Sequence, residues 1–183
     1  MDASTLADPA FAAALKFTLD QEGRIFEDVP GDPGGATKWG ITQADFDLWR
    51  HQHGMGTKSV ADASEQEITT VYADHYWVPL QCAKLPAAVA LEVFDAGVNV
   101  GASRSALWLQ AVLGVERDGF IGTTTLAAVT TYVAKHSAQL LAEAHLVRRR
   151  AYYRDLAQGH PALSKFLRGW LARCDHVAAV IGG

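Results

Sequence analysis

Apolar residues along this chain recur at three- and four-residue spacing in one stretch after another, with almost none of the alternation typical of a strand. The first such stretch follows Asp8, a residue suited to cap a helix, and Pro9, whose missing N–H is not needed at the first helical position. Its apolar face continues to Glu22, and Gly23 follows where a helix is expected to end. The pattern predicts a helix over 9–22, with Glu22 in its last turn on the apolar side.

Capping or helix-opening residues mark the remaining helical stretches. These are Thr42, Ser64, Pro86, Ser103, Thr123 or Thr124, Ser137 and Pro161. The stretch after Pro86 is apolar on most of its surface, so we expect it to be buried at the centre of the fold. Its polar interruptions, Asp95 and Asn99, must find hydrogen-bond partners there or line a cleft. The sequence therefore predicts an all-α fold of about eight helices, with at most a small β-hairpin near residues 24–38.

A loop dense in Gly, Pro and Asp separates the first two helical stretches. Asp28 and Asp32 lie in it among residues that favour tight turns and close backbone approach. A carboxyl such as Glu22 stays protonated in an apolar pocket, and a second, ionised carboxylate would complete the pair that glycoside hydrolysis uses. The alternative is that Glu22 only ends its helix at a polar rim and the loop is a surface turn. A calcium loop is disfavoured, because the spacing is not that of an EF-hand.

The residues Glu22-Gly23, Asp28 and the segment DPGGATKWGIT from Asp32 to Thr42 resemble the opening motif of the glycoside hydrolase family 108 muramidases. This resemblance implies a helical lysozyme-like fold in which Glu22 is the catalytic acid. The chain departs from the family in having Arg24 where a second glycine is usual, and in an interval to Asp32 about a residue longer than in typical members. The departures leave the role of Glu22 intact and make the second carboxylate the weaker assignment.

A second resemblance covers the chain from about Val93 to Val129, which is similar to the predicted peptidoglycan-binding region that accompanies family 108 catalytic segments. The matching residues are Asn99, Gly101, Leu109-Gln110, Leu113-Gly114, Asp118-Gly119, Ile121-Gly122 and Thr125-Leu126. We therefore expect a catalytic segment over 1–92 and a peptidoglycan-binding segment over 93–183. No linker separates the two, so we expect them to share one core.

Charge is distributed unevenly in a chain whose net charge is −4. Six basic and fifteen acidic residues precede Ala96, whereas ten basic and five acidic residues follow from there. The run Arg148, Arg149, Arg150 and Arg154 is interpreted as a solvated helix face, or as a surface that docks on an anionic wall polymer. Nucleic acid is excluded as a partner because a pI of 5.9 is far from the basic footprint of such proteins.

Nothing in the sequence calls for a metal or another cofactor, since Cys82 and Cys174 stand far apart without metal-ligand spacing and are expected to be buried thiols. No apolar run is long enough to span a membrane, and the first ten residues lack the features of a secretory signal. We expect a monomer made in the cytoplasm, which reaches the cell wall, in the periplasm of a Gram-negative host, through a holin or another export protein.

The resemblance implies an endo-acting N-acetylmuramidase of the lysozyme type that cleaves the β-1,4 bond from N-acetylmuramic acid to N-acetylglucosamine, as a phage endolysin or as a bacterial wall enzyme. Asp32 would act as base or position water, with Thr37 as a further water contact. Trp39, Tyr76 and Asn99 are candidates to bind the glycan, although core packing is the competing interpretation for Tyr76. The rivals are a lytic transglycosylase, a non-catalytic peptidoglycan-binding protein and a helical cytoplasmic interaction protein.

Overall fold

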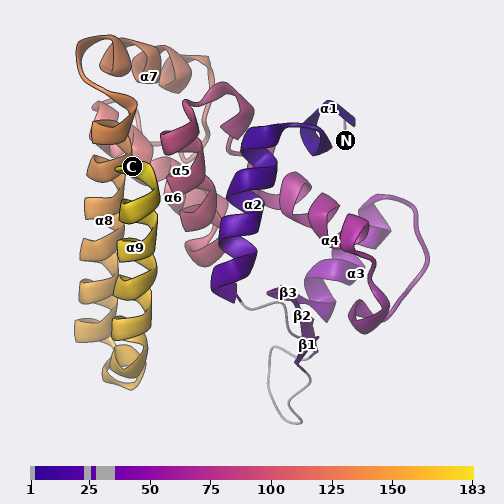
Figure 1. The fold of residues 1–183 in the computed structure, drawn as a ribbon. Helices are drawn as coiled ribbons and strands as arrows, with labels where there is room; N and C mark the ends of the chain where they lie inside the picture. The colour runs from indigo at the N-terminus through magenta and orange to yellow at the C-terminus, as the bar shows by residue number, and fades with distance from the viewer. Residues whose placement is uncertain (1–2, 23–25, 28–35) are drawn as a thin grey trace. The chain divides into compact units, whose positions relative to one another are not determined.

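A computed structural model of the protein describes residues 3–22, 26–27 and 36–183. These residues form nine α-helices and one very small sheet, so the all-α prediction is confirmed (Figure 1). The helices are α1 (Ala3–Leu6), α2 (Pro9–Glu22), α3 (Gln43–Gln52), α4 (Glu65–Tyr72), α5 (Ala87–Val100), α6 (Ala102–Leu113), α7 (Thr123–Lys135), α8 (Ala138–Gly159) and α9 (Leu167–Ile181). Short 3-10 turns cover Val60–Asp62, Cys82–Lys84 and Pro161–Phe166, and a π-helical turn covers Ala73–Trp77.

The sheet consists of β1 (Phe26–Glu27), β2 (Thr37–Lys38) and β3 (Ile41–Thr42), antiparallel and in the order β1-β2-β3. β1 and β2 are the strands of the hairpin predicted near residues 24–38. β3 adds a strand that the sequence did not predict.

Four of the predicted helix starts are confirmed by side-chain caps, at Asp8, Thr42, Ser64 and Ser137. The Thr42 side chain accepts a hydrogen bond from the Asp45 N–H, and Ser64 forms a complete capping box with Glu67. The last start was wrong, because Pro161 opens a 3-10 turn and α9 begins only at Leu167. Ser103 was also wrong as a cap, because α6 already begins at Ala102. The cap expected at Thr123 or Thr124 was wrong, because α7 already begins at Thr123 and Gly122 precedes it without a side-chain bond.

The chain divides into two compact units, an N-terminal unit over Met1–His75 and a C-terminal unit over Tyr76–Gly183. In the N-terminal unit, α2 and α4 line one small hollow, to which Leu15 and Leu19 contribute from α2 and Thr69 from α4. The buried side chains of α3 are Phe46 and Trp49. This unit therefore contains the helix that ends at Glu22 together with α1, α3 and α4.

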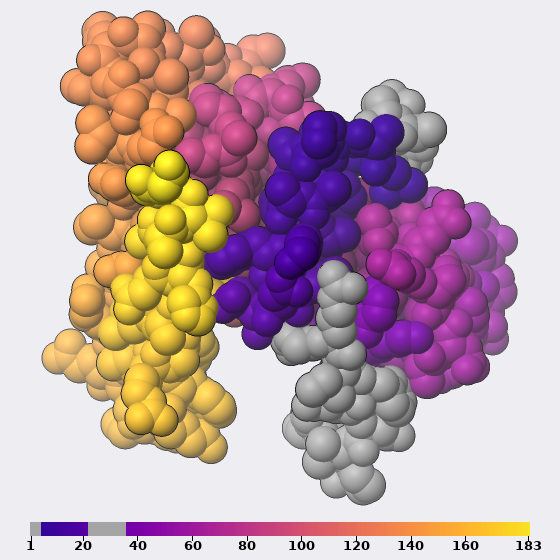
Figure 2. Space-filling model, viewed as in Figure 1, coloured from indigo at the N-terminus to yellow at the C-terminus, as the bar shows by residue number. Residues whose placement is uncertain are grey.

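The C-terminal unit is built around α5, which contacts α6, α8 and α9. Every residue from Leu91 to Gly97 is buried, so the prediction that this helix lies in the core is confirmed. Helices α8 and α9 lie side by side at the surface of the unit (Figures 1 and 2). Cys82 and Cys174 are free thiols and are buried, as expected, and burial raises the pKa of Cys174.

Candidate active site

The predicted catalytic residues are Glu22, at the end of α2, and residues that follow it in the sequence. Glu22 is the last residue of α2, as the sequence predicted. Its side chain lies outside the described residues, as do Asp28 and Asp32. Thr37 is half-buried on β2, where it pairs with Glu27 of β1 and Thr42 of β3.

Trp39 and Gly40 form the tight turn between β2 and β3. Both have a positive φ, 51° and 79° respectively, which is the combination that a two-residue hairpin of type I′ requires. Glycine adopts this conformation freely, but a tryptophan does so only when the surroundings hold it there. The Tyr72 hydroxyl supplies that restraint by donating a 2.6 Å hydrogen bond to the Trp39 carbonyl oxygen. The indole of Trp39 is half-buried, so part of it faces solvent at a fixed turn.

The side chain of Lys38 links β2 to the segment that precedes α4. Its Nζ donates hydrogen bonds of 2.8 Å to the Ala61 carbonyl and 2.7 Å to the Ala63 carbonyl. Gln43 provides a second link, because its Oε1 accepts from the Val60 N–H and its Nε2 donates to the Lys58 carbonyl. The strand that carries Thr37 is therefore tied to the connector between α3 and α4.

The carboxylate of Glu67 holds the same connector through ion pairs and a hydrogen bond. It accepts hydrogen bonds from Arg50 at 2.6 Å, from Lys58 at 2.7 Å and from the Ser64 N–H at 2.8 Å. Burial alone would raise the pKa of Glu67, but the Lys58 and Ser64 bonds outweigh that effect and lower it to about 2. Glu67 is thus ionised at neutral pH.

Tyr76 and Asn99, the other predicted glycan contacts, belong to the C-terminal unit. The half-buried ring of Tyr76 meets Phe94 edge-on, with 6.5 Å between the centroids, which is the packing contact expected of the competing interpretation. Asn99 lies near the end of α5, where its Oδ1 accepts a short hydrogen bond from the Tyr153 hydroxyl.

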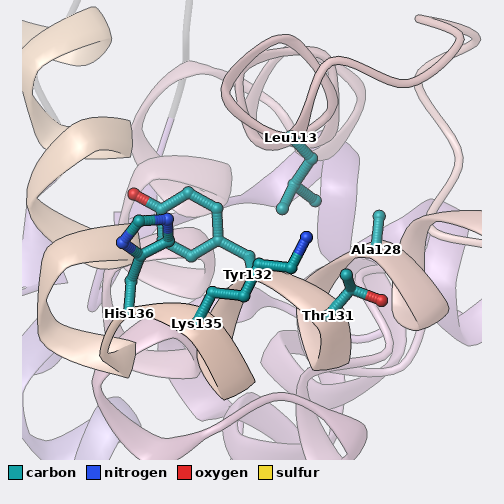
Figure 3. A pocket seen from close by; sticks show the side chains of 6 residues that line it. All are labelled: Leu113, Ala128, Thr131, Tyr132, Lys135 and His136. Carbon is teal, nitrogen blue, oxygen red and sulfur yellow. The ribbon is translucent and has the colours of Figure 1, made fainter.

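Two adjoining hollows on the C-terminal unit share Tyr132 of α7 as a wall. The first has a volume of about 410 Å³ and is lined by Leu113 of α6, by Ala128, Thr131, Tyr132 and Lys135 of α7, and by His136, which follows α7 (Figure 3). The second, of about 640 Å³, lies between α6 and α8. Volumes of this size are typical of sites for small ligands.

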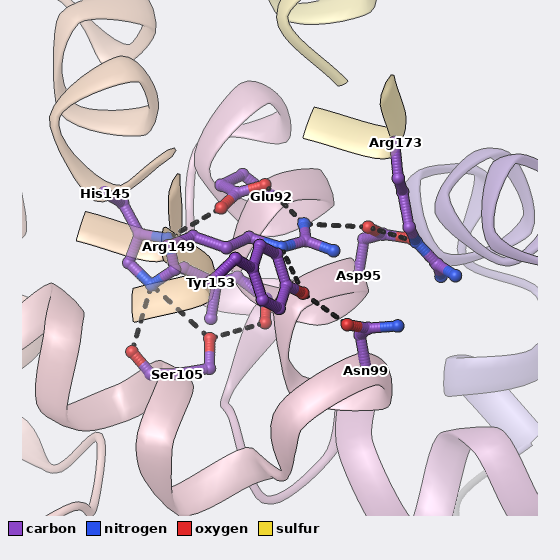
Figure 4. A network of polar contacts seen from close by, with 9 residues as sticks. Glu92, Asp95, Asn99, Ser105, His145, Arg149, Tyr153 and Arg173 are labelled. Atoms are coloured by element: carbon purple, nitrogen blue, oxygen red, sulfur yellow. Dashed lines mark hydrogen bonds and ion pairs between the residues drawn. The ribbon is translucent and has the colours of Figure 1, made fainter. Parts of the chain in front are cut away.

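A buried charge network, formed by Glu92, Asp95, Arg149 and Arg173, crosses the core of the C-terminal unit (Figure 4). The Arg149 Nη1 lies 2.9 Å from Asp95 and 3.1 Å from Glu92, and Arg173 grips both oxygens of Asp95. Burial would raise the pKa of Asp95, but the two guanidinium groups outweigh it and hold that pKa below its usual range. The carboxylates in turn keep the pKa of Arg149 well above its ordinary value against the effect of burial.

The network extends through polar neighbours on α6 and α8. His145 contacts Glu92 through Nδ1 at 2.9 Å and the Ser105 carbonyl oxygen through Nε2 at 3.0 Å. Tyr153 contacts Arg149 and also donates to Asn99. The predicted partners for Asp95 and Asn99 are thereby identified.

Arg149 corrects the interpretation of the arginine run. The sequence placed it with Arg148, Arg150 and Arg154 on a solvated or wall-docking face, but it is fully buried. The missed signal was the four-residue spacing of His145, Arg149 and Tyr153 along one side of α8, which matches polar positions at similar spacing on α5.

Among the described residues, no cluster of three or more His, Cys, Asp or Glu side chains is arranged to hold a metal ion. In that same part of the chain, no helix combines the length and apolarity that a membrane crossing requires.

The chain was compared with protein families and with known proteins. A family model described as Glycosyl hydrolase 108 matches residues 15–101, and one described as Predicted Peptidoglycan domain matches residues 104–175. No curated protein matches the chain. The solved structure of SagA from Brucella abortus is 33% identical, covers 93% of this chain and 92% of its own, and superposes with a TM-score of 0.76. The chain is a glycoside hydrolase that acts on peptidoglycan, and it belongs to the glycosyl hydrolase 108 family.

Proposed function

We propose that this peptidoglycan hydrolase is an endo-acting N-acetylmuramidase that cleaves the β-1,4 bond between N-acetylmuramic acid and N-acetylglucosamine, with Glu22 as its general acid. The observation that carries the proposal is the position of Glu22 as the last residue of α2, within the family match over 15–101. A carboxyl at that point follows an apolar helix face and precedes the strand that carries Thr37 and the turn that carries Trp39. A carboxyl that stays protonated beside apolar residues can give its proton to a leaving oxygen.

In this mechanism Glu22 protonates the glycosidic oxygen as the bond to the muramic acid carbon breaks. Asp32 positions or activates the water that attacks that carbon, and Thr37 contacts the same water. If the two carboxyl groups lie about 6.5–9.5 Å apart, water fits between them and the reaction inverts the anomeric centre; at about 5–5.5 Å it retains it. The product in both cases is a reducing muramic acid end.

Glycan contacts come from Trp39, Tyr76 and Asn99 in this proposal. Trp39 is supported by its restrained turn, because a partly exposed indole held at a positive φ presents a fixed face for a sugar ring. Tyr76 and Asn99 each have part of their surface accessible, in addition to their contacts with Phe94 and Tyr153. We keep the division into a catalytic segment over 1–92 and a peptidoglycan-binding segment over 93–183 as part of the proposal.

The biological role that we propose is that of a phage endolysin, which rests on the family resemblance. Producing the chain with and without a holin in a Gram-negative host tests this role. We expect the culture to lyse only when the holin releases the enzyme to the wall. Lysis by the holin alone to the same extent would remove the support for this role.

Mass spectrometry of the fragments released from purified peptidoglycan tests the activity. Wild type and Glu22→Gln are incubated near neutral pH, and the soluble fragments are reduced with sodium borohydride. We expect reducible muramic acid ends from the wild type and at least a thousandfold lower release from the variant, because the substitution removes the proton donor and leaves the side-chain volume unchanged. Anhydro-muramic ends would instead identify a lytic transglycosylase. No fragments from either protein, on walls that a control muramidase digests, would leave a binding protein.

A further inference from the structure

The two hollows that share Tyr132 form one surface, which we call the Tyr132 groove. Its walls come from three helices of the C-terminal unit, α6, α7 and α8. Tyr132 is half-buried and its ring lies against the ring of His136, with 4.7 Å between the centroids. Figure 3 shows Leu113 of α6 facing Tyr132 and Lys135 of α7 across the first hollow. An aromatic ring beside an aliphatic floor is the arrangement that suits the apolar face of a sugar.

Two cations line the groove without a carboxylate partner. Lys135 lies in the first hollow and Arg148 in the second. Arg148 makes one long hydrogen bond, 3.4 Å, to the Ala111 carbonyl oxygen, and neither cation forms an ion pair with a described residue. Two acids of the same unit are engaged elsewhere, Asp118 with Gln110 and Asp175 with Arg150. The groove therefore carries two cations, Lys135 and Arg148, that form no ion pair with a described residue.

A further cation continues the same seam between α6 and α8. Arg104 stacks on Tyr152, with 4.6 Å from the guanidinium carbon to the ring centroid, and also donates a short hydrogen bond to the Tyr152 hydroxyl. Tyr152 follows Arg148 by one turn of α8, so aromatic rings and cations alternate along the seam. A ligand that matches this surface needs flat apolar faces and carboxylates spaced along its length.

We propose that the Tyr132 groove binds the muramyl peptide of peptidoglycan, with an N-acetylated sugar against the Tyr132 ring and stem-peptide carboxylates at Lys135 and Arg148. The inference rests on the proposed function and names the ligand and the residues of the peptidoglycan-binding region, which the match over 104–175 covers. Stem peptides supply free carboxylates beside acetylated sugars at every repeat of the wall. Charge complementarity thus selects this ligand over an uncharged glycan.

Co-sedimentation with insoluble purified peptidoglycan tests the groove, in a Glu22→Gln background so that the wall is not digested. We expect Tyr132→Ala and the pair Lys135→Glu with Arg148→Glu each to weaken binding at least tenfold, whereas Tyr132→Phe keeps the ring and the affinity. The matched control is Lys165→Glu with Arg168→Glu, the same charge change at exposed positions outside the groove. Circular dichroism of each variant separates lost binding from lost folding. Equal weakening by control and groove variants would overturn the proposal.

Walls stripped of stem peptides by an amidase test the identity of the ligand. We expect the groove-dependent part of the affinity to disappear on these walls and to weaken with added salt on intact ones. The amidase leaves a lactyl carboxylate on each muramic acid, so undiminished binding to the stripped glycan would refute the contacts with stem-peptide carboxylates. The catalytic proposal fails separately, if Glu22→Gln still releases reducible ends, while the groove proposal fails if its variants bind normally to walls that the wild type digests.

Discussion

The β2–β3 turn of the N-terminal unit and the buried charge network of the C-terminal unit both hold distant parts of the chain together, but with different kinds of contact. At the turn, side chains hold backbone carbonyl oxygens, as Tyr72 holds Trp39 and Lys38 holds the connector. In the network, side chains hold one another, and all four charged groups are buried or nearly so. A bond to a carbonyl fixes a loop at little risk, because water can replace the lost partner. A buried ion has no such replacement, so each charge depends on the others.

The two regions should therefore respond differently to a single substitution. Loss of one partner at the turn should alter the position of Trp39, and with it catalysis, more than the stability of the protein. Loss of one partner in the network should destabilise the C-terminal unit and leave an uncompensated charge in its core. Arg149→Met and Tyr72→Phe test this contrast, and Glu67→Gln tests a half-buried charge of intermediate effect.

Arg149→Met should destabilise the protein by about 3–5 kcal/mol, because Glu92 and Asp95 would lose a buried partner while similar volume is retained. Urea unfolding followed by circular dichroism measures the change. The control is the neighbouring Arg150→Met, whose partner Asp175 has a side chain 67% exposed, so the loss should stay below about 1 kcal/mol. Similar losses of unfolding free energy in the two variants would show that burial does not determine how much an ion pair contributes to stability.

Acid should destabilise the protein through Glu67. Its pKa is lowered in the folded state, from 4.5 to about 2, so its stabilising contribution is complete above pH 4.5 and is lost as the pH falls toward 2. We expect Glu67→Gln to remove roughly 2 kcal/mol of stability at pH 7 and much less at pH 2.5. Urea unfolding at the two pH values measures the difference, with Glu65→Gln of the same helix as the control. An equal loss at both pH values would argue against an electrostatic contribution.

Tyr72→Phe should cost about 1 kcal/mol of stability, since it removes one hydrogen bond and leaves the Trp39 carbonyl to water. Fragment release from peptidoglycan should fall more than this loss of stability implies, because the indole would no longer be held at its positive φ. Trp39→Gly relieves the strain and removes the ring, so in it a Tyr72→Phe change should have almost no further effect on activity. If the two changes had additive effects on activity, the Tyr72 hydroxyl would not act through the Trp39 turn.

The helices could be predicted because their signals are local. The caps at Thr42 and Ser64 act on N–H groups three residues away, and apolar spacing alone placed α5 in the core. The Trp39-Gly40 turn was not predicted, because tryptophan is not the residue expected at a positive φ and the Tyr72 restraint lies 33 residues away. The side-chain geometry of Glu22 and Asp32 stays a prediction.

The charged partners in the core could not be predicted from the sequence, because they too are far apart along the chain. Asp95 was expected to need partners, but Arg149 and Arg173 belong to helices that follow it much later in the chain. Arg149 was misjudged because three arginines surround it in a short stretch, and only the packing of α8 against α5 decides which of them turns inward. Local patterns show which residues form a helix, but they do not determine which of its faces packs against the core.

The buried network also restricts how α8 can slide. A shift of α8 by one turn along α5 would move Arg149 away from Glu92 and Asp95 and leave the two buried carboxylates without its guanidinium group. The network therefore fixes the register of α8, and with it the alignment of Arg148 and Tyr152 on the outer side of the same helix. Engineers who wish to change Arg148 and Tyr152 should find the helix tolerant, provided that these four inner charges are kept or exchanged together.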